Sequence, residues 1–266
     1  MSAFCEGGIA TAAAAEDCEL HVRIMPEMGI AGQVRRLIRN RYLHLWEMSA
    51  SCPRMIRFSF FGIPVEIQPW FWVILALLGS SFGQLGGTAN EALGIALFVI
   101  AGAISIFVHE LGHAFAGVIC KAKPFIVLHG FGGFAAFPGA RFTRMQSFMV
   151  TAAGPAIQIV LGVIAAVIWF FMADVSEAFR GFIFDLASVS IFWALLNLIP
   201  VYPLDGGQMM AATLGPQRRK LCLQISIAVA VIVAILMLIY TRRIMMPIFM
   251  LYFAYQNFQE LRETYR

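Results

Sequence analysis

The chain is strongly apolar and carries few charges. It has 266 residues, of which 60% are hydrophobic and 13% charged, with a mean hydropathy of +0.79 and a net charge of +4. So few polar residues cannot cover the surface of a water-soluble globule of this size. The composition excludes an ordinary soluble enzyme and predicts an all-α polytopic membrane protein.

Residues 1–54 differ from the rest because they contain no apolar stretch long enough to cross a membrane. Within them, Arg35, Arg36 and Arg39 stand between apolar residues at helical spacing, which would make a basic helix on the membrane surface. We predict an N-terminal extension over residues 1–54, either disordered or folded as this interfacial helix, and a transmembrane domain over residues 55–266.

The transmembrane domain is expected to begin with β structure and continue with helices. Residues 57–67 are rich in β-formers and predict a short strand. Residues 124–139 combine β-formers with glycines and predict a hairpin near the cytoplasmic face, with a plain loop as the alternative. Apolar stretches long enough to cross a membrane predict about six transmembrane helices, at 68–85, 93–118, 147–173, 180–200, 220–240 and 244–259.

Lysine and arginine gather on one side of the predicted spans. Because these residues are retained on the cytoplasmic side, their distribution predicts that both termini are cytoplasmic. The side that holds the N-terminus has Lys121, Lys123, Arg141, Arg144, Arg218, Arg219, Lys220, Arg262 and Arg266, whereas the opposite side has Arg180, Arg242 and Arg243.

His109, Glu110 and His113 form the pattern H-E-x-x-H in the second predicted span. Residues four apart share one face of an α-helix, so both imidazoles can bind one metal ion while Glu110 approaches a water beside it. Imidazole and carboxylate ligands with one open position are typical of zinc. Since such polar residues are costly inside a hydrocarbon span, the pattern predicts one zinc ion per chain, with Glu110 as the base.

Two histidines need at least one more protein ligand, and few acidic residues follow His113. Asp205 follows the cytoplasmic end of the fourth span, close to the membrane face that carries the histidines. Prolines and glycines in residues 197–207 interrupt regular helix there, as is tolerated beside a watery cavity. Asp205 is therefore the predicted third ligand, with a capping aspartate at an ordinary helix end as the alternative. The remaining acids fall in the external loop, at the external start of the fourth span or in the terminal tail: Asp174, Glu177, Asp185, Glu260 and Glu263.

At these residues the sequence resembles the site-2 protease family of intramembrane zinc metalloproteases, peptidase family M50. The family has H-E-x-x-H in one span and, two spans later, N-x-x-P followed by L-D-G. The matching residues here are His109, Glu110, His113, Asn197, Pro200, Leu204, Asp205 and Gly206. Ala153, Gly154 and Pro155 resemble the family's A-G-P element, and Gly132 and Gly133 stand where the family has a β-hairpin.

The resemblance covers about residues 57–215 and is to the compact members without a PDZ domain, with two further spans over 220–259. It implies cleavage of transmembrane protein substrates within a lipid bilayer, in the cell membrane of a prokaryote, with no nucleic-acid partner. It also implies that His109, His113 and Asp205 bind zinc, that Glu110 activates water, and that Asn197 holds the substrate or polarises its carbonyl. Gln158 and Gln208 depart from the residues common in the family.

Three other functions fit parts of the pattern. A prenyl-protein peptidase would use a distant glutamate as third ligand, which here could only be Glu260. A catalytically idle chaperone or retention factor would use the same fold to bind membrane helices. A zinc carrier would need further polar residues along a path through the spans, and the sequence has few.

Overall fold

The computed structural model describes residues 55–82, 90–172, 175–241 and 244–265, within a compact unit that spans Arg54–Arg266. The N-terminal extension predicted over residues 1–54 lies outside the described residues. So do four residues used to reason about topology and ligands: Asp174, Arg242, Arg243 and Arg266. The division of the chain into extension and transmembrane domain therefore stays a prediction.

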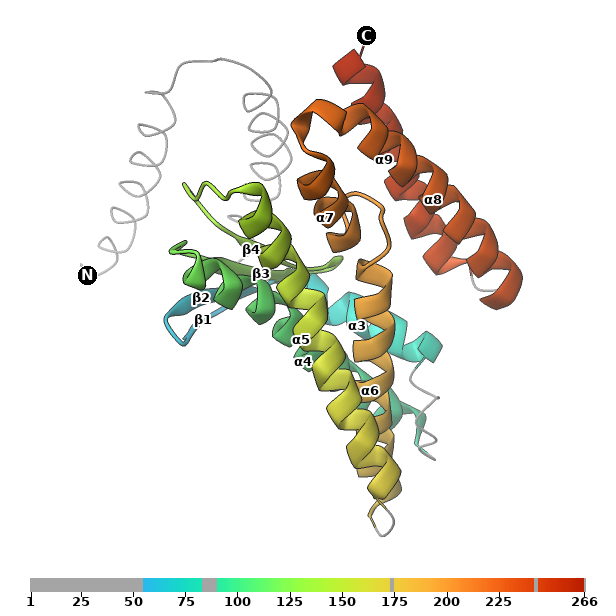
Figure 1. Cartoon of the computed structure of the whole chain (residues 1–266). Coiled ribbons are helices and arrows are strands. Elements are labelled where there is room, and N and C mark those ends of the chain that lie inside the picture. Colours follow the sequence, from blue (N-terminus) through green and yellow to red (C-terminus); the bar gives the residue numbers. More distant parts are fainter. Residues whose placement is uncertain (1–54, 83–89, 173–174, 242–243, 266) are drawn as a thin grey trace, which may run out of the picture. The chain divides into compact units, whose positions relative to one another are not determined.

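Helices occupy all six predicted spans (Figure 1). They are α3 (Pro69–Phe82), α4 (Glu91–Ile119), α5 (Arg144–Phe171), α6 (Glu177–Asn197), α8 (Arg219–Thr241) and α9 (Met245–Tyr265). Among the described residues, four helical segments are long and apolar enough to cross a membrane: α4, α5, α6 and Pro216–Tyr240. Helix α3 is shorter, so the predicted fold class is confirmed while the count of six spans is approximate.

Regular helix stops after α6, as the prolines and glycines predicted. Residues 198–204 are irregular, and a short helix that the sequence did not predict, α7 (Asp205–Leu214), begins directly at Asp205. A 3₁₀ turn, η1 (Pro216–Arg218), then leads into α8. A Cβ at Gly206 would collide with the carbonyl oxygen of Leu198, so glycine lets the chain fold back closely on the end of α6.

Four strands form one sheet in the order β1-β2-β3-β4. The strands are β1 (Ile56–Phe60), β2 (Ile63–Ile67), β3 (Phe125–His129) and β4 (Gly132–Ala136). Strands β3 and β4 form the predicted hairpin. The single strand predicted over residues 57–67 is wrong in one respect, because Phe61 and Gly62 turn with positive φ, as a tight hairpin turn requires, and divide it into two strands.

The parallel pairing of β2 with β3 joins the two hairpins, although more than 50 residues separate them in the sequence. One face of this sheet packs on α3 and α4. The shared core contains Ile63, Val65, Phe71, Leu75, Ile106, Leu111, Ala114, Ile126 and Leu128, all buried. Burial of this apolar surface fixes the sheet beside the turn of α4 that carries the histidines.

Candidate metal centre

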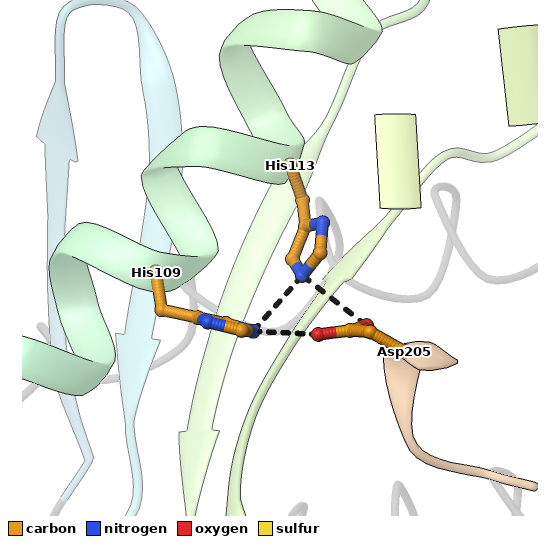
Figure 2. A group of neighbouring side chains, drawn as sticks. All are labelled: His109, His113 and Asp205. Carbon is orange, nitrogen blue, oxygen red and sulfur yellow. Dashed lines mark hydrogen bonds and ion pairs between the residues drawn. The ribbon is translucent and has the colours of Figure 1, made fainter. Parts of the chain in front are cut away.

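Two side chains of α4 and one from the start of α7 converge on a single point (Figure 2). His109 Nε2 lies 3.0 Å from His113 Nε2 and 3.0 Å from Asp205 Oδ2, and His113 Nε2 lies 3.5 Å from Asp205 Oδ1. All three residues are buried. Asp205 does not cap a helix, because it is the first residue of α7 and the N-cap is Leu204.

The opposite ring nitrogen of each histidine is held by a neighbour on α5. His113 Nδ1 lies 2.8 Å from the carbonyl oxygen of Val150, and His109 Nδ1 lies 2.9 Å from Oε1 of Gln158. A carbonyl can only accept, so in the neutral ring His113 Nδ1 carries the proton and Nε2 presents its lone pair to Asp205. This is the orientation in which a histidine binds a metal ion.

The Asp205 carboxyl is ionised at neutral pH. Burial by itself would raise its pKa, but when His109 and His113 are protonated, their hydrogen bonds and positive charge outweigh burial and lower the pKa to about 2. A ligating carboxylate must be deprotonated, and Asp205 meets that requirement.

The donor set fits a metal ion. A buried carboxylate and two imidazoles with facing Nε2 atoms need a positive charge among them, supplied either by protons or by a cation. Ligand atoms around a tetrahedral zinc ion lie about 3.3 Å from one another, and the three separations here are 3.0, 3.0 and 3.5 Å. In the described part of the chain, this is the group of acidic, cysteine and histidine side chains that can hold a metal ion.

Gly154 on α5 makes room for the His113 ring. A Cβ at this position would overlap His113 Nε2, the atom that faces the metal site. Gly112 on α4 permits equally close packing, because a Cβ there would lie 2.6 Å from the Ala153 carbonyl oxygen. The A-G-P element noted from the sequence thus has a steric reason, which is the close approach of α5 to the histidine face of α4.

Glu110 lies beside the metal-binding group and against strand β4. Its Oε2 is buried and has no hydrogen-bond partner among the described residues. A Cβ at Gly133 would lie 2.7 Å from Glu110 Cγ and 2.8 Å from Oε1, so the strand passes directly over this carboxyl. Glu110 is therefore placed between the metal-binding side chains and one edge of the sheet.

Asn197 is not part of the metal-binding group. It ends α6 and lines a cavity of about 100 Å³ whose walls come from α3, α6, α9 and the turn between β3 and β4. Leu204, the neighbour of Asp205 in the chain, lines the same cavity. The His129 ring also lines it, and burial lowers the pKa of that histidine.

The irregular segment before Asp205 is tied to α8 and α9 through Tyr202. The Tyr202 N–H donates to Ser226 Oγ (3.1 Å), and its carbonyl accepts from Asn257 Nδ2 (2.5 Å). The Arg219 guanidinium lies 4.2 Å from the centre of the Tyr202 ring and is paired with Glu260 at 2.7 Å. Sequence reasoning missed this anchor because its residues lie on helices that the motifs do not include.

The same ion pair argues against Glu260 as a third ligand. Glu260 accepts from Arg219 Nε and Nη2, and it is absent from the group of described side chains that could hold a metal ion. Asp205 takes the position that the prenyl-peptidase alternative would give to Glu260.

We expect Gly154→Ala to remove metal binding without unfolding the protein, because the added methyl group displaces the His113 imidazole. Zinc content of the purified variant, measured by atomic absorption, should fall at least tenfold. Gly79→Ala is the control, since a Cβ there would lie 3.2 and 3.3 Å from side-chain atoms and 3.4 Å from the Ile95 carbonyl oxygen, without overlap. Equal zinc content in both variants would contradict the steric argument.

Comparisons with known proteins find similarity to zinc metalloproteases. Residues 172–240 match the model described as Peptidase family M50. A Synechocystis protein provisionally named as a zinc metalloprotease is 35% identical over 167 residues, which are 57% of this chain and 42% of that protein. A zinc metalloprotease from Methanocaldococcus jannaschii is 26% identical over 159 residues, 59% of this chain and 44% of that protein.

The chain thus spans less than half the length of these relatives. The solved structure of the site-2 protease from M. jannaschii shares the fold, with a TM-score of 0.54 and 21% identity, over 78% of this chain and 95% of that one. The stage IV sporulation protein FB of Bacillus subtilis is 31% identical over 153 residues, 56% of this chain and 46% of that protein. The chain therefore contains a region of peptidase family M50 over residues 172–240, is similar to zinc metalloproteases, and shares the fold of a solved site-2 protease.

Proposed function

We propose that this protein is a zinc metalloprotease that hydrolyses peptide bonds in or near the membrane-spanning segments of other proteins. The observation that carries the proposal is the convergence of Asp205 with His109 and His113, which lie with Glu110 on a helix apolar enough to cross a membrane. Polar side chains at that depth need a functional reason, since the bilayer penalises them strongly.

The proposed roles follow from the position of each side chain. His109, His113 and Asp205 would hold one zinc ion. Zinc, when bound, polarises a carbonyl oxygen and lowers the pKa of a bound water to about 7. Glu110 would accept the proton of the attacking water at Oε2, the buried oxygen with no partner among the described residues.

Strand β4 would hold the substrate in extended form. Leu128 of β3 accepts a hydrogen bond from Gln68, on the β2 side, so it does not bond to Gly133 opposite it on β4. Gly133 therefore directs its N–H and C=O away from the sheet, and so does Ala135, two residues on. A substrate strand added along this edge would pass Glu110, and its main-chain hydrogen bonds would tolerate many sequences.

If the substrate adds to β4 as a strand, every second substrate N–H faces β4. Cleavage should therefore depend on the N–H groups at alternate positions of the substrate. Synthetic spans N-methylated at single positions near the cleaved bond should lose cleavage at alternate positions, where the N–H faces β4, and keep it at the others. Mass spectrometry of the products measures both sets. A uniform loss, or none, would count against docking on β4.

Substrates must unwind before they reach this edge, because a peptide carbonyl in a helix is hydrogen-bonded and covered. We infer that spans with helix-weakening residues such as glycine or proline are preferred. Asn197 would contact the substrate from the cavity that it lines next to the turn between β3 and β4.

The catalytic roles are tested by reconstituting the protein in liposomes with a tagged membrane-spanning substrate. Glu110→Gln should keep its zinc but lose cleavage by about 10²-fold or more, because glutamine cannot accept the proton. His109→Ala should lose zinc and cleavage together. Asn197→Ala should keep zinc and lose less activity than Glu110→Gln.

Full activity of Glu110→Gln would end its assignment as the base. An uncut substrate in the presence of the zinc-loaded, folded protein would favour the chaperone or retention alternative. Addition of a chelator, followed by zinc, is the control, since activity lost to the chelator must return with the metal.

We also propose that the protein lies in the cell membrane of a prokaryote with both termini in the cytoplasm. The supporting observation is that lysine and arginine flank the end of α4, the start of α5 and the start of α8, which connectivity places on one side.

The orientation is tested by labelling single cysteines with a membrane-impermeant maleimide. Lys123→Cys, between α4 and β3, should be labelled only after the cells are permeabilised, whereas Glu177→Cys, at the start of α6, should be labelled in intact cells. Both side chains are exposed. The reverse pattern would mean the opposite orientation.

A further inference from the structure

Gln158 is a polar side chain buried in the middle of the α4–α5–α6 packing. It lies on α5 and is 0% exposed, as are Ser105 on α4 and Ser190 on α6. The catalytic and zinc-binding roles proposed above are not assigned to any of these three residues. A buried amide at membrane depth must satisfy its hydrogen bonds within the protein, so each of its contacts restricts how it is oriented.

Three contacts link these residues to the metal site. Gln158 Oε1 lies 2.9 Å from His109 Nδ1, and Gln158 Nε2 lies 2.8 Å from Ser105 Oγ and 3.5 Å from the Ser105 carbonyl oxygen. Ser190 Oγ donates to Ser105 Oγ at 2.9 Å. The result is a chain of hydrogen bonds that starts on α6, crosses α4 and α5, and ends on His109.

The direction of this chain is determined by the Ser105 end. A main-chain carbonyl has only lone pairs, so the amide NH₂ of Gln158 must face Ser105, and Oε1 must face His109. Ser105 Oγ lies 2.8 Å from Gln158 Nε2 and 2.9 Å from Ser190 Oγ and can accept from both, as this orientation requires. An oxygen that can only accept therefore faces His109 Nδ1.

This acceptor determines which nitrogen of His109 carries the proton. With Nδ1–H donating to Gln158, Nε2 is left with its lone pair directed at Asp205 Oδ2, 3.0 Å away. If the amide were reversed, its NH₂ would meet Nδ1, the proton would move to Nε2, and the nitrogen that faces Asp205 would be blocked. His113 is fixed separately by the carbonyl of Val150.

We propose that Gln158 is a positioning residue, which holds His109 in the tautomer and ring orientation that bind the metal ion, with Ser105 fixing the direction of its amide. This proposal rests on the proposed zinc site. It also gives a role to Gln158, one of the departures from the family pattern, because its amide bridges His109 and Ser105.

The test compares four purified proteins: the unaltered chain, Gln158→Met, Gln158→Glu and Ser190→Ala. Methionine keeps the length of the side chain but removes the strong acceptor, so the Kd for zinc, measured by competition with a chromogenic chelator, should rise about 10- to 100-fold. Glutamate keeps an acceptor for Nδ1–H, so Gln158→Glu should restore the Kd to within about threefold of the unaltered chain.

Ser190→Ala separates positioning from helix packing. It removes a buried hydrogen bond between α4 and α6 but leaves the acceptor of His109 in place. We expect it to lower the unfolding temperature in detergent while the Kd for zinc changes less than threefold. Gln158→Met should also change the visible absorption spectrum of the cobalt-substituted protein, which reports on ligand geometry and which Ser190→Ala should leave unaltered.

An unchanged Kd and cobalt spectrum in Gln158→Met would overturn the proposal. So would equal loss of zinc in Gln158→Met and Gln158→Glu, because the acceptor would then be irrelevant. If the unaltered chain itself failed to bind zinc, the proposed function would fall first. The measurement on the unaltered chain therefore distinguishes the two failures.

Discussion

The structure depends on the close approach of one buried carboxylate, Asp205, to two buried imidazoles, His109 and His113. Asp205, His109 and His113 come from helices separated by two further crossings of the fold, and none of the three would be stable alone at that depth. Together they form a group that needs a cation, and their separations fit a tetrahedral ion. Close packing at Gly112 and Gly154 positions the histidines, and the irregular segment before Asp205 brings the carboxylate to them. The sheet packs beside Glu110 next to the same group.

Two parts of the fold support the three side chains of the group. α5 supports the histidines, through the Val150 carbonyl, the Gln158 amide and the space left at Gly154. α8 and α9 support Asp205 indirectly, because Ser226 and Asn257 fix both polar groups of the Tyr202 backbone three residues before it. The carboxy-terminal helix pair, although outside the motifs, therefore contributes to the geometry of the site.

The same arrangement explains how an enzyme of this kind could act within a membrane. Glu110 has one buried oxygen with no partner among the described residues, and it lies under a strand edge with outward main-chain groups at Gly133 and Ala135. An unwound substrate needs main-chain partners in place of the helix it has lost, and a sheet edge supplies them. The apolar cavity that Asn197 lines is also lined by Leu204, the neighbour of Asp205 in the chain.

The sequence alone determined the membrane class and the positions of six helices. It predicted the hairpin at residues 124–139, with a plain loop as the alternative, and the pairing of H-E-x-x-H with Asp205, with a capping aspartate as the alternative. These follow from local properties: apolar length, helical spacing, and the small number of acids that topology leaves available. Only the tertiary structure decided that residues 57–67 make two strands, that β2 pairs in parallel with β3, and that α7 begins at Asp205. It also decided the roles of Gln158, Gly154 and Tyr202, because each acts on a residue far away in the chain, and spacing within one segment carries no record of such contacts.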